Sequence, residues 1–265
     1  WQSRIERVWD QQRGYPAPPL EPAPGVPANT FWTATQHYGY GRELANTGGD
    51  QRIDYWLNQG HSEAETYRRL QYAPAQGAVA HGTHVLGSAA GNRSYAPSTH
   101  DRPWHAVSDK ASQASIIAVQ LPALPYKDTS GTGLCVQILD AISYIHLHAA
   151  GRKVVINLSD GAYAGPHDGT SMLERAIDDF YGRNADRSAL VVAAGNQFNE
   201  RVHWHGESPA NGGTAEPITW NILPDDSTDS HLEIWPDSQL TGQALQQLKV
   251  RVTPPGLAPL DMVPF

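Results

Sequence analysis

Two histidines three residues apart stand in a run of small residues. The segment HGTHVLGSAAG covers residues 81–91, and His81 is its first residue. A neutral imidazole can take a proton from a nucleophile and return it to a leaving group. The small residues allow a helix to approach its neighbours closely. The segment predicts a helix that buries its first turn and begins at His81, whose imidazole is a candidate for proton transfer. The alternatives are a structural histidine at a glycine-rich helix start and a metal-binding pair of His81 with His84.

Two later segments are apolar runs that end in polar residues. They read VVINLSDG over residues 154–161 and VVAAGN over residues 191–196. Both runs have the length of a buried strand, and sites in doubly wound sheets form at the carboxyl ends of strands. The residues expected at this edge of the sheet are Asn157, Ser159, Asp160, Gly161 and Asn196.

In this order, the three segments resemble the motifs of the subtilases, a family of serine peptidases. The resemblance implies that His81 is the general base of a catalytic triad and that the amide of Asn196 stabilises the oxyanion. It also implies that the strand end at residues 157–161 pairs with a polypeptide substrate bound as an extended strand. The activity expected from the resemblance is endopeptidase hydrolysis of peptide bonds through an acyl-enzyme.

The nucleophilic serine of such a triad is not identified in the sequence. Gly169, Thr170 and Ser171 spell the family's serine motif, but they precede Asn196, whereas the family's serine follows this asparagine. Ser171 is therefore a weak candidate. With Glu174 three residues later, Asp168, Thr170 or Ser171 is better explained as the cap of a following helix.

The catalytic aspartate is missing in the same way. Its family setting is an apolar strand ending in Asp-(Ser/Thr)-Gly, and Asp10, the weak candidate, stands instead in Val-Trp-Asp-Gln-Gln. Residues 4–11 resemble bacterial subtilases with a long insertion between aspartate and histidine, including relatives of the clostridial germination proteases. In these proteins the Trp-Asp-Gln stretch follows the aspartate. The resemblance implies a partial catalytic domain, inactive alone, whose aspartate precedes Trp1 and whose serine follows Phe265. The alternative is a non-catalytic peptide-binding or scaffold chain with a degenerate subtilase fold.

Hydrophobic periodicity predicts an α/β fold built on a doubly wound parallel sheet, the incomplete subtilisin-like core, with an inserted antiparallel β segment. Short apolar runs alternate with helical patterns between residues 80 and 204, and period-two alternation follows in residues 205–265. Residues 1–79 are predicted to be an irregular insertion region, because six prolines fall within residues 16–27. The expected strands are residues 115–120, 154–158 and 190–194, and the expected helices are residues 38–44, 61–70, 134–149 and 173–180.

Composition excludes several classes of partner. A formal charge of −8 and the lack of basic clusters argue against nucleic acid, and no apolar run is long enough to span a membrane. The single cysteine, Cys135, excludes an internal disulfide and an all-cysteine metal site. No cofactor is expected to be required, and structural calcium, common in the family, cannot be assigned to residues. The pairs His146/His148 and His203/His205 leave a metalloprotein as a third alternative. The resemblance favours an exported protein.

Overall fold

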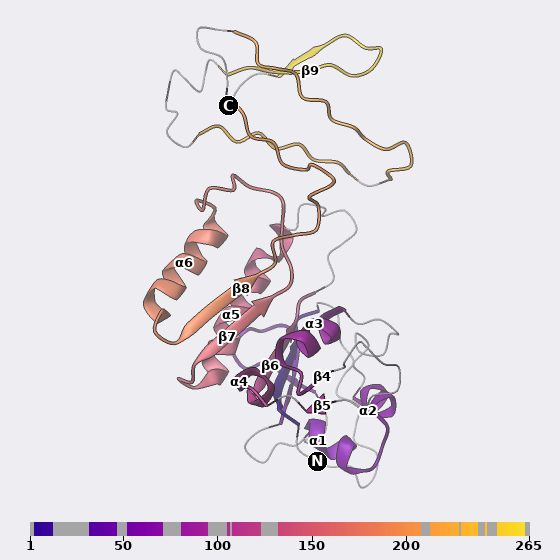
Figure 1. Ribbon diagram of the computed structural model, residues 1–265, viewed down its shortest axis with the longest axis vertical. Coiled ribbons are helices and arrows are strands. Elements are labelled where there is room, and N and C mark those ends of the chain that lie inside the picture. The colour runs from indigo at the N-terminus through magenta and orange to yellow at the C-terminus, as the bar shows by residue number, and fades with distance from the viewer. Residues whose placement is uncertain are drawn as a thin grey trace.

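The structure is a computed structural model. It describes residues 3–12, 32–46, 52–70, 81–94, 105–106, 108–122, 132–207, 213–227, 229–237, 242 and 248–262. The proline-rich stretch of residues 16–27 lies outside these ranges. The elements, drawn in Figure 1, are β1 (Ile5–Asp10), β2 (Thr33–Ala34), β3 (Arg42–Ala45), α1 (Arg52–Asn58), α2 (Glu63–Arg69), α3 (His81–Ala90), β4 (Arg93–Ser94), β5 (His105–Ala106), α4 (Lys110–Gln113), β6 (Ile116–Gln120), the 3₁₀ turn η3 (Thr132–Leu134), α5 (Cys135–Ala149), β7 (Val154–Leu158), α6 (Met172–Asn184), β8 (Ser188–Val192), β9 (Val250–Val252) and β10 (Leu260–Met262).

A four-stranded sheet in the order β2-β3-β1-β6 organises the first half of the chain. β1 pairs in parallel with β6 and antiparallel with β3, whose register sets Asp10 opposite Arg42. The region predicted to be irregular therefore contributes strands to a sheet. The helix predicted over residues 38–44 is wrong, because residues 42–45 form β3. Pairing with β1, about thirty residues away in the chain, overrides a local pattern that was too short to specify a helix.

The two faces of β1 pack against different layers. Val8 belongs to a core with Leu44, with apolar residues of α1 and with Leu70, which follows α2, while the neighbouring Trp9 is fully buried on the opposite face. The Trp9 ring lies 4.6 Å from that of Tyr38 and 4.7 Å from that of Tyr144 on α5, measured between ring centroids. Because successive side chains of a strand point to opposite faces, β1 contacts the first core with one face and α5 with the other. α2 begins as predicted, with Ser62 capping its first turn.

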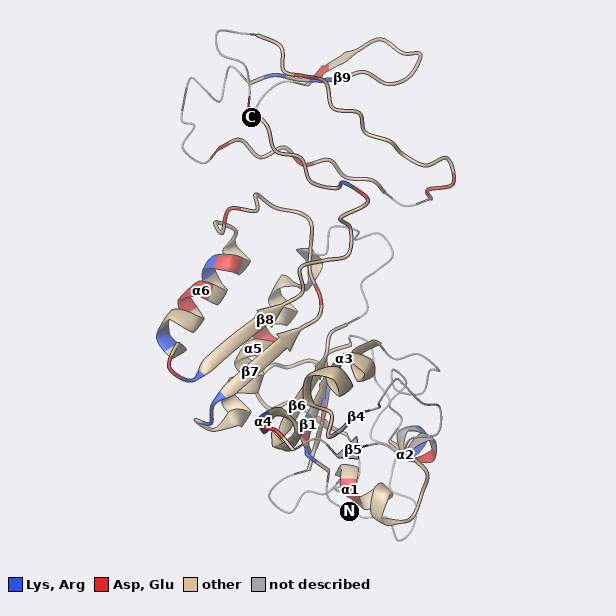
Figure 2. Cartoon of the chain, viewed as in Figure 1, with Lys and Arg blue, Asp and Glu red and all other residues tan. Residues whose placement is uncertain are grey.

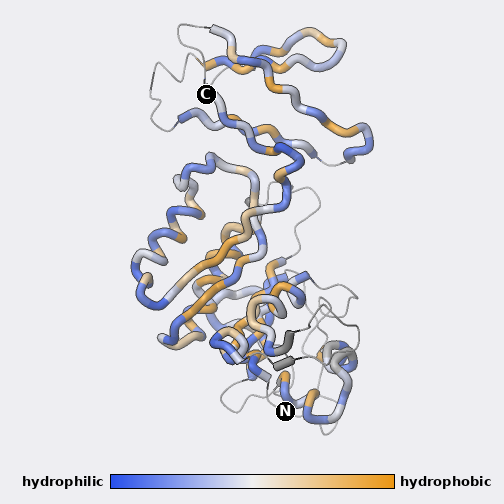
Figure 3. The backbone as a smooth tube through the Cα atoms, viewed as in Figure 1, coloured by the Kyte–Doolittle hydropathy of each residue, from blue (hydrophilic) through white to orange (hydrophobic). Residues whose placement is uncertain are grey.

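A second layer pairs β7 and β8 in parallel and covers one of their faces with α5 and α6. The residues predicted to recur along α5 do face this core: Leu134, Ile138, Ile142 and Ala149 are buried with Val154 and Ile156 of β7, and Ile145 packs against them. Figure 3 shows β7, β8 and α5 as largely hydrophobic. The outer face of α6 carries charges of both signs, visible in Figure 2. This amphipathic pattern fixes which side of α6 faces the strands.

The α/β class holds, but the described strands do not form one doubly wound sheet. The predicted strands appear as β6, β7 and β8, yet β6 is hydrogen-bonded only to β1 in the first sheet, and β7 is paired only with β8. α5 connects β6 to β7 and packs against both. The two parallel pairs are therefore separate sheets bridged by one helix.

The last part of the chain contains one antiparallel pair, β9 with β10. The alternation in residues 205–265 predicted further strands, but Ile218–Ile222 and Leu232–Ile234 form no regular strand and are exposed. Their alternating pattern lacks a paired strand within the described ranges, and alternation without a partner does not make a sheet. No helix in the described ranges has the length and hydropathy needed to cross a membrane.

Candidate functional site

The carboxyl ends of β7 and β8 bring two of the three sequence motifs together. Asn157 pairs in register with Val191, and the pairing continues past the strands, where Ala193 N–H donates to the Leu158 carbonyl at 3.2 Å. The segment 157–161 and the Ala-Gly-Asn turn at residues 194–196 therefore leave the pair side by side. Asn157, Ser159, Gly161 and Asn196 are exposed, and Asp160 is half-buried. Polar groups at this edge are open to an incoming chain.

Tyr163, which the sequence motifs do not include, joins the two segments. Its hydroxyl oxygen accepts the backbone N–H of Asn196 at 3.1 Å and the hydroxyl donates to the Gln197 side chain. Gly195 has φ of 88°, and a Cβ placed there would lie 2.6 Å from the Tyr163 hydroxyl. Any larger residue at 195 would meet both backbone strain and this hydroxyl. Tyr163 and Gly195 together set the backbone of Asn196. The only sequence signal for this is an aromatic residue shortly after the segment 154–161.

His81 begins α3, as predicted, but the first turn of this helix is not buried. None of the residues of α3 is buried, and His81 and His84 are exposed. The carboxyl end of the helix is fixed by Arg4, which donates to the Ala90 carbonyl and, at 3.1 Å, to the Ala114 carbonyl after α4. Within the described residues, no hydrogen bond or ion pair joins His81 to the ends of β7 and β8. The structure therefore does not join the histidine motif, residues 81–91, to the other two motifs.

Ser171 caps α6. Its Oγ accepts the Glu174 N–H at 3.2 Å, and a carboxylate oxygen of Glu174 accepts the Ser171 N–H at 3.1 Å. This reciprocal pair is a capping box, which satisfies two backbone donors at the helix start. Asp168 instead holds the preceding turn, accepting from the Thr170 hydroxyl at 2.6 Å. The predicted explanation of this motif as a helix cap is confirmed, with Ser171 as the cap.

Replacing Ser171 by alanine is expected to lower the free energy of unfolding by about 1 kcal/mol, because one helix donor loses its acceptor. Aspartate at the same position can still cap the helix and is expected to keep stability near that of the original chain. Urea unfolding followed by circular dichroism measures both. Equal destabilisation of the chain by alanine and by aspartate at position 171 would contradict the cap assignment.

Asp10, the weak aspartate candidate, is engaged in a buried ion pair. Its side chain is 1 % exposed, and Oδ2 lies 3.2 Å from Nε of Arg42 across the β1–β3 pair. The guanidinium of Arg42 in turn lies 4.1 Å from the centre of the Trp32 ring. A buried carboxylate needs such a cation, and Arg42 supplies it. No contact in the described part of the chain links Asp10 to His81, and the ion pair accounts for its burial.

The histidine pairs do not converge on a common ligand position. Among the described residues, no group of three or more histidine, cysteine, aspartate or glutamate side chains is arranged to hold a metal ion. The ring of His146 packs against Phe180, at 4.7 Å between centroids, whereas the ring of His148 packs against Tyr144 at 4.4 Å. His203 stacks on His167 at 4.8 Å. The rings of His146 and His148 therefore have different neighbours.

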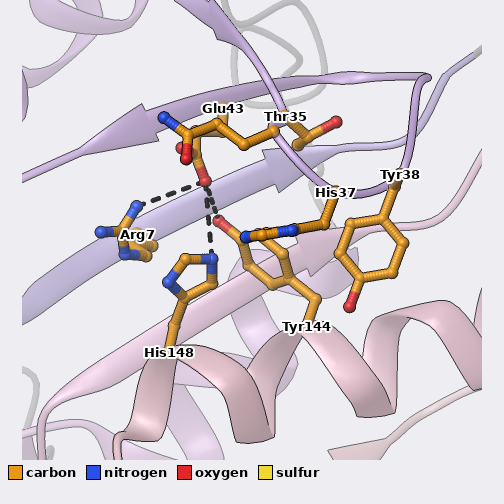
Figure 4. Close-up of a pocket in the computed structure, with 8 residues that line it drawn as sticks. Arg7, Thr35, His37, Tyr38, Glu43, Tyr144 and His148 are labelled. Atoms are coloured by element: carbon orange, nitrogen blue, oxygen red, sulfur yellow. Dashed lines mark hydrogen bonds and ion pairs between the residues drawn. The ribbon is translucent and has the colours of Figure 1, made fainter.

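A polar pocket of about 110 Å³ lies away from all three motifs, between β1, β3, the turn before β3 and α5. Figure 4 shows the Glu43 carboxylate between Arg7, Tyr144 and His148. Its Oε2 accepts the Tyr144 hydroxyl at 2.6 Å and lies 3.3 Å from Nη1 of Arg7 and 3.9 Å from Nε2 of His148. Burial and the bond to Glu43 raise the pKa of Tyr144. Burial, then Arg7, lowers the pKa of His148, although Glu43 acts to raise it.

The residues of this pocket were not predicted as a site. Arg7 and Glu43 stand far from Tyr144 and His148 in the chain, and no short motif contains them. The spacing of Tyr144 and His148, four residues apart, places them on one face of α5, and this is the only local signal.

Comparison with known proteins agrees with the motifs. The model of the subtilase family matches residues 49–223, which is well over half of the chain and includes all three motifs. Searches of curated proteins and of solved structures give no match. The chain belongs to the subtilase family of serine peptidases.

Proposed function

We propose that this chain is the central part of a subtilisin-like endopeptidase domain, with half of the active site on its own residues. His81 takes the proton of the nucleophilic serine and delivers it to the leaving amine. The side-chain amide of Asn196 donates to the oxyanion of the tetrahedral intermediate. The aspartate and the serine come from segments on either side of residues 1–265.

The observation that carries this proposal is the meeting of Asn157–Gly161 with Asn196 at one edge of the β7–β8 pair. The backbone of residues 159–161 leaves the strand beside the turn that holds Asn196. A polypeptide bound as an added strand along residues 159–161 would bring a scissile carbonyl toward Asn196. The side chain of Asn196 has no hydrogen-bond partner among the described residues, whereas its backbone is held by Tyr163. An oxyanion donor needs a fixed backbone and a side chain available to the substrate.

Open strand edges support the proposed flanking segment on the amino side. Among the described strands, β6 is the last of its sheet and β7 is an edge of its own pair, and α5 packs against both. Strands joined by a helix normally lie in one parallel sheet, and unpaired edges expose backbone donors and acceptors. A strand inserted between β6 and β7 would unite the two sheets. We assign this position to the apolar strand that ends in the catalytic aspartate.

Uncovered apolar faces support the segment on the carboxyl side. The face of β7–β8 that does not contact α5 and α6 exposes Val155 and Val191, at 75 % and 52 % of their surfaces. α3 carries half-buried Val85 and Leu86 without a fully buried residue. Parallel sheets are ordinarily covered on both faces. Further helical structure, including the segment with the serine, would cover these surfaces and bury the small residues of α3.

Labelling with a fluorophosphonate probe tests the proposal, because the probe reacts only with an activated serine. The present chain is expected to take no label and to hydrolyse no peptide. The coding sequence around it is expected to contain Asp-(Ser/Thr)-Gly on the amino side and Gly-Thr-Ser on the carboxyl side. A protein extended through both motifs is expected to be labelled at the serine of the second motif.

The outcomes separate the proposal from its alternatives. Label on Ser171 in the present chain would show that the order of motifs has been misjudged. Flanking sequences without both motifs would remove the peptidase proposal and leave the non-catalytic peptide-binding chain. Label on the new serine that disappears when the amino-side aspartate is replaced would support the complete triad.

A further inference from the structure

We propose that the pocket between β1, β3 and α5 binds a small oxyanion and that binding is strengthened by protons. The pocket is lined by Arg7, Gln36, His37, Glu43, Tyr144 and His148. None of these residues belongs to the family motifs. The proposal is therefore independent of the catalytic assignment.

The fixed charges of the pocket cancel, so that any charge it gains is positive. Glu43 is neutralised by Arg7 at 3.3 Å, and its Oε2 also accepts the Tyr144 hydroxyl. His148 lies 3.9 Å from Glu43 at this pocket, and histidine is the side chain that ordinarily gains charge between pH 5 and 8. Protonation changes the pocket from neutral to cationic. A cationic ligand would have to compete with Arg7 for Glu43, whereas an anion meets groups that can donate.

The donors of the pocket suit oxygen ligands. Arg7 meets Glu43 through Nη1, and a guanidinium carries five N–H donors in all. A guanidinium favours carboxylate, sulfate and phosphate, because paired N–H groups match two oxygens. The amide of Gln36 and the imidazoles add further donors, while the rings of Tyr38 and Tyr144 limit the space. A volume of about 110 Å³ accommodates several water molecules or one small anion.

Protonation of His148 is the step that couples anion binding to pH. The groups that face its ring are Glu43 on β3, Arg7 on β1, His37 in the turn before β3 and Tyr144 on its own helix. The side chain of Arg152 donates a hydrogen bond to the backbone carbonyl of His148. Burial and the positive charge of Arg7 lower the pKa of His148 in the empty pocket. A bound anion adds negative charge beside this ring and favours its protonated form. By reciprocity, protonation must favour the anion by the same factor.

Sulfate is the suitable probe, since its charge does not change across the titration of histidine. Calorimetry on the 265-residue chain would compare sulfate binding at about pH 6.2 and about pH 8.2, at constant ionic strength. Sulfate is expected to bind at least about fivefold more tightly at the lower pH. Acetate serves as a second probe and distinguishes a carboxylate site from one that requires a tetrahedral anion.

Three glutamine variants locate the effect. His148→Gln is expected to reduce the pH dependence and to weaken sulfate at the lower pH by about fivefold. His37→Gln removes a side chain that lines the pocket and is expected to weaken sulfate binding. His203→Gln, at an exposed histidine stacked on His167 outside the pocket, is the matched control and is expected to change nothing. His37 is exposed on a turn, so its variant tests the site without disturbing the core. Equal binding at both pH values, no binding, or equal weakening in His203→Gln would overturn the proposal.

Discussion

Alanine in place of His81 is expected to reduce kcat of the complete peptidase by about 10⁴-fold or more, with little change in KM. The serine hydroxyl is a poor nucleophile until a base takes its proton, and in the proposed function substrate binding is assigned to residues 157–161 and not to the imidazole. The same variant is expected to lose fluorophosphonate labelling. Steady-state hydrolysis of a peptide substrate, with kcat and KM determined separately, measures the effect.

His84 provides the matched control for His81. It lies on the same helix, is equally exposed, and is one helical turn further along. His84→Ala is expected to keep kcat within a small factor of the unchanged enzyme. Equal losses in the two variants, restored by added zinc, would instead favour the metal-binding pair. A normal kcat in His81→Ala would remove His81 from the triad.

Asn196→Ala is expected to lower kcat by about 10²- to 10³-fold and to leave KM nearly unchanged. The amide hydrogen bond forms fully only when negative charge develops on the substrate oxygen, so its loss acts on the transition state. The backbone of Asn196 is held independently by the Tyr163 hydroxyl at 3.1 Å, and the alanine variant keeps this contact. The loss of rate can therefore be attributed to the missing side chain.

Asn199 is the control for this second variant, because it lies in the turn that follows and is also exposed. Asn199→Ala is expected to be indistinguishable from the unchanged enzyme. A rise in KM at constant kcat for Asn196→Ala would show that the amide binds substrate in the ground state and would contradict an oxyanion role. Aspartate at position 196 removes the donor and adds a negative charge, and we expect it to be slower than alanine.

Elements with strong local signals could be predicted from the sequence. α5 was predicted because its apolar residues recur at helical spacing, and α6 because Ser171 and Glu174 form a capping box. β7 was predicted at its observed bounds, since a short run rich in Val and Ile has few other stable structures. The meeting of Asn157–Gly161 with Asn196 followed from the parallel arrangement of such strands.

Elements that depend on distant partners could not be predicted from the sequence. β1 has a mixed sequence, Ile-Glu-Arg-Val-Trp-Asp, and becomes a strand through β3 and β6. The Asp10–Arg42 pair and the cluster around Glu43 join residues from different elements. The local sequence around one residue gives no signal of its distant partner. The small residues of α3 predicted a buried helix, but burial requires a covering layer, and none is present among the described residues. The alternation near Ile218 and Leu232 likewise predicted strands without specifying their partners.

The parallel pairing of β1 with β6 also determines how the chain must fold. β1 can pair with β6 only when the chain closes a loop of more than a hundred residues. The two Arg152–Glu6 hydrogen bonds close a loop of 146 residues. Contacts at such separation must overcome a large loss of chain entropy before they stabilise anything, and proteins dominated by them fold slowly. The β7–β8 layer, with its shorter connections through α6, can form first. Folding of this domain is therefore expected to proceed from the middle of the chain outwards, with the amino-terminal strands docking last.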